Sequence, residues 1–246
     1  MDVIILSQHW VSIIVVAMIF ISMIVFLAKK YMITYALIFT NFIIFIISIL
    51  FQNQILGGMQ YAGLGFRPIY LTPEYFPQIY TLFTSMFVHG GFLHIFGNML
   101  VLFFVGTAFE NRVGWKKFIL IYIIGGICGT LAHSILNLDP NYRFITLIGA
   151  SGAIFAIMGG FAFSYPHDKV VMPIPVGFFM ILRRIKVLYA VILFAVIETV
   201  IVLLDVQDQT AHFAHLGGLI GGVIIAAIIL RGNKTHTKKG DTIYYD

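Results

Sequence analysis

Seven long apolar runs dominate the amino-acid sequence and restrict the folds that the chain can adopt. A helix needs about 20 apolar residues to cross the hydrocarbon core of a bilayer. The runs that reach or approach this length are residues 11–28, 32–51, 91–109, 118–136, 144–164, 187–204 and 211–230. Because lipid offers the backbone no hydrogen-bond partners, each run is expected to be helical. We therefore predict an all-α, polytopic membrane protein.

The composition excludes a soluble globular protein. Of the 246 residues, 60% are hydrophobic and 10% are charged, against about 45–50% and 25% in soluble domains. The net charge of +5 comes from small basic clusters between the apolar runs, a pattern that indicates membrane topology and not nucleic-acid binding. The single cysteine, Cys128, cannot form an intramolecular disulfide and is expected to be a packing residue.

The basic residues also predict the orientation of the chain. If the loops alternate between the two sides of the membrane, 13 of the 15 lysines and arginines fall on one side. Only Arg67 and Arg143 fall on the other, as expected when the basic loops are cytoplasmic. The first run has no basic stretch before it and no small-residue cleavage site after it, so we expect a retained helix. We predict a multi-pass plasma-membrane protein with its N-terminus outside and its C-terminus cytoplasmic.

The external connection 52–80 is long and rich in glycine, proline, tyrosine and phenylalanine. Aromatic rings are favoured at the membrane interface, and loops of this length are usually functional or disordered. We expect a folded loop that lies in the interface.

Four polar residues lie at similar depths in three of the predicted helices. At 1.5 Å per residue, Ser151 and His94 are each about 6–7 Å below the external surface, and Asn98 is about 12 Å below it. His215 lies at a depth similar to that of Ser151 in the last run. Polar groups inside a membrane are costly, so their convergence at one level indicates a functional site.

The chemistry of these residues fits acyl transfer. A serine hydroxyl becomes a strong nucleophile when a neighbouring histidine removes its proton, so Ser151 and His215 are a candidate nucleophile and base. Donors for a developing oxyanion are available from Asn98, His94 and the backbone N–H of Ser151. Glycines at 149 and 152 would leave that backbone accessible.

Small residues predict a close approach of the two helices that carry the pair. Gly218 and Gly222 form a small-xxx-small face on the last run. The residues around the serine are also small, at positions 149–153.

These motifs resemble those of the rhomboid intramembrane serine proteases, over about residues 32–231 and six of the seven runs. The matching residues are Gly149, Ala150, Ser151 and Gly152 for GxSG, His94 and Asn98 for HxxxN, His215 with Gly217, Gly218 and Gly222, and Gly106, Glu110, Arg112 and Gly114. The resemblance implies that Ser151 is the nucleophile, His215 the general base, and His94 and Asn98 oxyanion donors. It also implies that the ring of Phe155 packs on His215.

The resemblance implies a domain organisation. Residues 1–31 would be an accessory N-terminal transmembrane helix, 32–231 the protease core, and 232–246 a polar cytoplasmic tail. The family often carries a Trp-Arg pair in the first loop, where this chain has Tyr80 and Thr81.

The implied activity is that of an intramembrane serine endopeptidase that cleaves transmembrane segments of membrane-protein substrates through an acyl-enzyme. The substrate would enter laterally, with residues 187–204 and 205–210 as gate and cap. We expect a Ser-His dyad with no acidic residue beside His215, since Asp205 and Asp208 belong to an external loop. Glu198, the only carboxylate well inside a run, is expected to be structural.

Two other functions remain open. A transporter could use a path lined by histidines, at positions 89, 94, 133, 212 and 215. A rhomboid-like protein could bind transmembrane clients without cutting them, but it would be expected to lack the serine or the histidine. No cofactor or metal is expected, because HExxH is absent, and an aspartyl protease is excluded because no run contains aspartate.

Overall fold

The computed structural model describes residues 2–51, 63–136, 140–176, 179–204 and 210–230, and most of them are helical. The α-helices are α1 (Asp2–Ala28), α2 (Ile33–Phe51), α3 (Thr81–Thr84), α4 (Phe92–Val101), α5 (Thr107–Val113), α6 (Trp115–Leu136), α7 (Ser151–Ser164), α8 (Val187–Leu203) and α9 (His212–Ile229). A π-helical turn at Leu102–Gly106 joins α4 to α5. The prediction of an all-α polytopic protein is confirmed, and each apolar run contains a helix.

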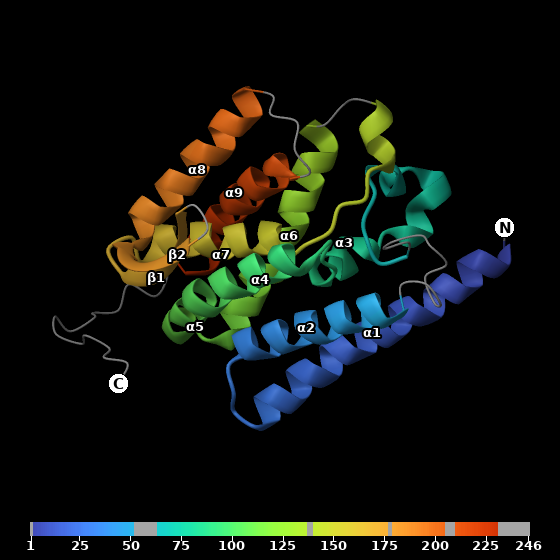
Figure 1. The fold of residues 1–246 in the computed structure, drawn as a ribbon, viewed down its shortest axis with the longest axis horizontal. Helices are drawn as coiled ribbons and strands as arrows, with labels where there is room; N and C mark the ends of the chain where they lie inside the picture. Colours follow the sequence, from blue (N-terminus) through green and yellow to red (C-terminus); the bar gives the residue numbers. More distant parts are fainter. Residues whose placement is uncertain (1, 52–62, 137–139, 177–178, 205–209, 231–246) are drawn as a thin grey trace.

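Three helices in the described part of the chain are long and apolar enough to cross a bilayer, at Phe92–Val113, Trp115–Leu136 and His212–Ile229. Shorter apolar helices accompany them, at Ile13–Ala28, Ile33–Ile49, Ser151–Ser164 and Val187–Leu203. In Figure 1, α7 lies in the interior of the bundle, α8 lies at its periphery, and α1 runs beside α2 on the opposite side.

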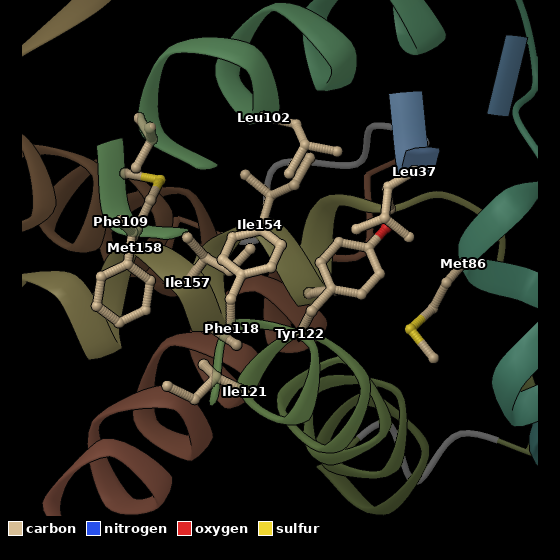
Figure 2. Packing of buried hydrophobic residues seen from close by; sticks show 14 of the residues in the cluster. Leu37, Met86, Leu102, Phe109, Phe118, Ile121, Tyr122, Ile154, Ile157 and Met158 are labelled. Atoms are coloured by element: carbon tan, nitrogen blue, oxygen red, sulfur yellow. The ribbon is translucent and has the colours of Figure 1, made fainter. Parts of the chain in front are cut away.

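The core forms where α6 and α7 pack together. In Figure 2, Phe118, Ile121 and Tyr122 of α6 lie close to Ile154 and Ile157 of α7. All five side chains are buried. Burial of a large apolar side chain stabilises a water-soluble protein by about 1.5–3 kcal/mol, but in lipid the gain comes from close packing instead.

Glycines bring α9 against α7. A Cβ atom added at Gly218 would collide with the carbonyl oxygen of Gly152, and one added at Gly222 would collide with that of Ala156. The two backbones therefore touch along the small-residue face of α9, as small-xxx-small packing requires.

The predicted start of the fifth helix at residue 144 is wrong, because α7 begins at Ser151. Before it, Pro140–Phe144 forms a 3₁₀ turn and residues 145–150 are not helical. Leu147 and Phe66 exchange backbone hydrogen bonds of 2.6 and 3.0 Å, and the N–H of Gly149 donates to the carbonyl of Ser85 at 2.9 Å. These long-range bonds satisfy the backbone without a helix, so Ser151 is the first residue of a helix and not the second turn of one.

A two-stranded antiparallel hairpin follows α7, in a segment where we predicted only a loop. Strands β1 (Lys169–Val176) and β2 (Phe179–Lys186) pair with Lys169 opposite Lys186. Proline residues are tolerated in β1 because it is an edge strand. Arg112 of α5 anchors the base of the hairpin through a 2.7 Å ion pair with Asp168.

The Glu110 side chain caps the N-terminus of α2. Its carboxylate accepts hydrogen bonds from the backbone N–H groups of Ile33 and Thr34, both at 2.8 Å, and from the Thr34 hydroxyl at 2.6 Å. The first N–H groups of a helix lack intrahelical acceptors, and a carboxylate also complements the helix dipole. The Glu110 motif named above therefore links α5 to α2.

The described part of the loop that we expected to be external, residues 63–80, is folded into 3₁₀ turns at Pro68–Leu71 and Pro73–Gln78. Residues 52–62 lie outside the described residues. The Tyr80 hydroxyl donates to the carbonyl of Gly63 at 3.0 Å. Tyr80, which replaces the tryptophan often found in the family, therefore links the two ends of this part of the loop. The rings of Tyr75 and Phe76 are exposed.

Candidate active site

Ser151 and His215 lie within hydrogen-bond distance of each other. The serine Oγ is 2.8 Å from Nε2 of the histidine. Ser151 is the first residue of α7, and His215 is in the first turn of α9. The glycine contacts between these helices bring the two side chains together, and the serine is half-buried, so its hydroxyl remains accessible.

The ring of Phe155 stacks on the imidazole of His215. Their centroids are 4.5 Å apart, and the planes differ by 5°. Phe155 lies one turn after Ser151 on α7, so one helix presents both the hydroxyl and a flat surface for the imidazole. This contact limits the rotation of His215 about its χ2 bond.

The expectation that no acidic residue neighbours His215 is wrong. Glu198 of α8 directs Oε1 at Nδ1 of His215, 2.9 Å away. Glu198 is buried, with only 7% of the residue exposed. Asp205 and Asp208, the acids considered from the sequence, lie outside the described residues.

The same carboxylate also binds His212. Oε2 of Glu198 is 2.6 Å from Nδ1 of His212, one turn before His215 on α9. Both carboxylate oxygens therefore have an imidazole partner, as a buried charge requires. His212 is therefore linked to the site by its hydrogen bond to Glu198, whereas His215 contacts Ser151 directly.

His94 faces the backbone immediately before the serine. The N–H of Gly90 donates to Nδ1 of His94 at 3.3 Å. A neutral imidazole that accepts through Nδ1 carries its proton on Nε2, and this nitrogen would lie 2.7 Å from a Cβ atom added at Gly149. Nδ2 of Asn98 would lie 3.9 Å from the same point, so α4 directs two donors at the turn that carries Ser151.

His89 is a further residue of this region, and the sequence indicated it only as part of a transport path. It is 2% exposed, and its Nε2 accepts the N–H of Ala150 at 3.4 Å. Burial, with the charge of nearby His94 as a smaller cause, lowers the pKa of His89 to about 3. The ring is therefore neutral and supports the turn before Ser151.

The start of α7 supplies backbone donors. Ile154 donates the first intrahelical hydrogen bond, to Ala150. The N–H groups of Ser151, Gly152 and Ala153 consequently have no intrahelical acceptor. They carry the positive end of the helix dipole at the serine.

A small cavity of about 30 Å³ adjoins the serine. Most of its lining residues are glycine, alanine, serine or threonine; the lining comes from residues 85–86, 126, 130, 147–149, 151–153, 211 and 214. A cavity needs at least about 10–15 Å³ on this measure to hold a water molecule, so this one has room for a small group.

A carboxylate and two imidazoles, the usual kinds of metal ligand, lie together at Glu198, His212 and His215. Their ligand atoms are within 4.8 Å of one another. Both histidine Nδ1 atoms already pair with the carboxylate. We therefore assign the three side chains as a hydrogen-bonded cluster and not as a metal site. HExxH is absent from the chain.

Comparison with known proteins identifies the class. Residues 77–232 match the family model of the rhomboid domain, which covers more than half of the chain. The chain belongs to the rhomboid family, and it is an integral membrane protein.

Individual relatives agree with this assignment. The chain is 28% identical over 153 residues to RHOMBOID-like protein 1 of Arabidopsis thaliana, across 62% of this chain and 35% of the relative. It is 31% identical over 148 residues to Rhomboid protease GluP of Bacillus subtilis, across 60% of this chain and 25% of the relative. Rhomboid-like protease 3 of Toxoplasma gondii is 26% identical over 148 residues, across 60% and 51%. The chain therefore covers at most about half of the length of these relatives.

Proposed function

We propose that the protein is an intramembrane serine endopeptidase that cleaves transmembrane segments of other membrane proteins. The observation that carries the proposal is the 2.8 Å contact between Ser151 Oγ and His215 Nε2, at the start of two helices in a membrane protein. A serine and a histidine in this relationship are a nucleophile and its general base. Relatives named as rhomboid proteases support the proposal.

In the first step, Ser151 Oγ attacks the carbonyl carbon of the scissile peptide bond. The Oγ–H proton moves to Nε2 of His215 as the C–O bond forms, and the carbonyl π electrons move to the oxygen. The C–N bond then breaks, and the leaving amine takes the proton from His215. Water repeats the sequence on the acyl-enzyme and releases the carboxyl product.

The developing oxyanion would be stabilised by donors from two helices. The backbone N–H of Ser151 lies at the positive end of α7, and His94 and Asn98 of α4 face the Gly149 turn. Donors aimed at the position of the developing charge contribute about 3–4 kcal/mol each.

The substrate would present an unwound segment, because the hydrogen bonds of a helix shield its carbonyl groups. The cavity beside Ser151 would receive a small substrate side chain. On the topology predicted from the basic residues, cleavage occurs near the external side of the membrane. Residues 1–31 would be an accessory helix and residues 32–231 the protease core.

The test is cleavage of a panel of single-pass transmembrane segments by the purified protein. Ser151→Ala and His215→Ala should each lower turnover by about 10⁴- to 10⁶-fold. Ser134→Ala is the matched control, because that hydroxyl bonds only the Thr130 carbonyl of its own helix, at 2.8 Å. Equal cleavage by wild type and Ser151→Ala would refute the proposal.

A serine-reactive fluorophosphonate separates the alternatives. It should label wild type and neither site variant. An intact protein that binds transmembrane segments but is not labelled would instead be a client-binding rhomboid-like protein. Transport in liposomes that is lost on substitution of the histidines, without labelling, would indicate the transporter.

A further inference from the structure

We propose that Glu198 is a positioning residue for the catalytic histidine, so that Ser151, His215 and Glu198 act as a triad built from α7, α9 and α8. This inference rests on the proposed serine protease function. The sequence predicted a dyad, and the carboxylate comes from a helix with no other charged residue.

The two nitrogens of His215 have partners of different kinds. Nδ1 faces the carboxylate of Glu198 at 2.9 Å, and Nε2 faces the hydroxyl of Ser151 at 2.8 Å. An ionised carboxylate can only accept, so the neutral imidazole must carry its proton on Nδ1. Nε2 then presents its lone pair to the serine hydroxyl, which is the tautomer that a general base needs.

The carboxylate itself is held in a fixed orientation. Oε2 of Glu198 is 2.6 Å from Nδ1 of His212, while Oε1 binds His215. Rotation of the carboxylate would break both hydrogen bonds. Stacking of Phe155 against the same imidazole restrains the ring from a third direction.

The same geometry serves the charged stage of the reaction. When His215 takes the serine proton, the imidazolium carries one positive charge next to the Glu198 carboxylate. Charges attract more strongly in a site with little water, and both Glu198 and His215 are at most 8% exposed. Glu198 acts on Ser151 through His215, because its carboxylate bonds the imidazoles of His215 and His212, and of these two rings His215 contacts the serine.

The test compares Glu198→Gln and Glu198→Asp with wild type in cleavage of a transmembrane substrate and in acylation by a fluorophosphonate. Glutamine keeps the shape of the side chain but removes its charge. In proteases with a Ser-His-Asp triad, changing the aspartate to asparagine lowers turnover about 10⁴-fold because it favours the wrong tautomer of the histidine.

We expect Glu198→Gln to lower kcat and the acylation rate by about 10²- to 10⁴-fold, with KM within about threefold of wild type. Glu198→Asp retains the charge, so its kcat and acylation rate should be at least about tenfold higher than those of Glu198→Gln. A purely structural role would not produce this difference between the two variants.

Two further variants serve as controls, one at the position next to Glu198 on α8 and one at His212, the other histidine that bonds Glu198. Thr199→Val alters the next residue of α8, which is exposed and bonds only its own helix through Ala195, and it should leave the rates unchanged. His212→Gln leaves the Glu198–His215 pair in place and should cost less than about tenfold, because it removes only the outer support of the carboxylate.

The outcomes separate this inference from the proposed function. If wild type neither cleaves nor is labelled, the proposed function fails. If wild type cleaves and Glu198→Gln retains its kcat within about threefold, the triad is wrong and the protease remains. Unfolding of both Glu198 variants, judged by thermal melting, would assign the residue to stability and overturn the inference. Loss of wild-type activity with a chelator, restored by zinc, would overturn it by assigning the cluster to a metal.

Discussion

Nε2 of His94 lies so close to the backbone of Gly149 that a Cβ atom added there would be 2.7 Å from it. Gly149 also has a φ of +118°, a conformation that residues with a side chain rarely adopt. Two independent causes therefore require glycine two residues before the serine.

Gly149→Ala should consequently inactivate the protein. A methyl group would displace His94 and strain the turn, at a cost of about 1–3 kcal/mol for the backbone alone. We expect cleavage to fall at least about 10²-fold. Gly91→Ala is the control, because Gly91 is extended and a Cβ atom there would have no neighbour within 4 Å. Normal cleavage by Gly149→Ala would show that activity does not depend on the position of His94 or on the conformation of this turn.

Asn98→Ala should lower kcat with little change in KM. If the amide donates to the oxyanion, its loss costs about 10²- to 10³-fold, or roughly 3–4 kcal/mol. Asn98→Asp should be at least as damaging, because it replaces the donor with a negatively charged acceptor. Steady-state kinetics on one substrate would check both. An increase in KM alone would assign Asn98 to substrate binding instead.

The size of the cavity beside Ser151 predicts a preference for small substrate side chains. Its volume of about 30 Å³ leaves little room for an aromatic ring. A substrate with alanine before the scissile bond should be cleaved at least about tenfold faster than one with phenylalanine. Met86 lines the cavity and is 2% exposed, so Met86→Ala should narrow that difference. An unchanged preference would place the substrate side chain elsewhere.

Gly218→Ala should destabilise the helix bundle. The new Cβ atom would collide with the carbonyl oxygen of Gly152, and forced overpacking costs about 1–3 kcal/mol or more. Thermal unfolding in detergent should show a lower midpoint. Gly97→Ala, in α4, has no neighbour within 4 Å of its Cβ atom and should melt at or above the wild-type temperature. Equal melting of the two variants would contradict the close packing of α7 and α9.

His89 should make the protein less stable in acid. Its pKa of about 3 in the folded state is below the ordinary value of 6.5, so between these pH values the unfolded chain binds a proton that the folded chain does not. The free energy of unfolding therefore falls as pH falls from 6.5 towards 3, by up to about 1.4 kcal/mol per pH unit, and is unaffected at higher pH. Thermal melting of His89→Gln should depend less on pH than that of wild type. Identical slopes would show that His89 is protonated in the folded protein.

The sequence predicted the apolar helices and the residues near the serine because those signals are local. Long apolar runs identify spans, and the small residues around Ser151 and Gly218 indicate close helix packing. The depth estimates grouped Ser151, His215, His94 and Asn98, which the structure brings together. The predicted start of the helix that carries Ser151 was wrong. Residues 145–150 continue the apolar run, and they are not helical because Leu147 pairs with Phe66 and Gly149 bonds Ser85, both far away in sequence.

The sequence does not show that Glu198 pairs with His215, because α8 is apolar on every side. An amphipathic helix would show which face points inward, but here the surrounding residues give no such indication, and the pairing depends on how α8 lies against α9. The hairpin β1–β2 was missed for a related reason. Short apolar strands between helices are not distinguished from a loop by periodicity alone.

The shortness of α7 has a consequence for the surrounding lipid. Its 14 residues span about 21 Å, whereas the hydrocarbon layer is about 30 Å thick. The helix alone is therefore too short to cross this layer, and non-helical chain at residues 145–150 precedes it. A thinner bilayer would match α7 better than a thick one, so the acyl-chain length chosen for reconstitution should alter turnover.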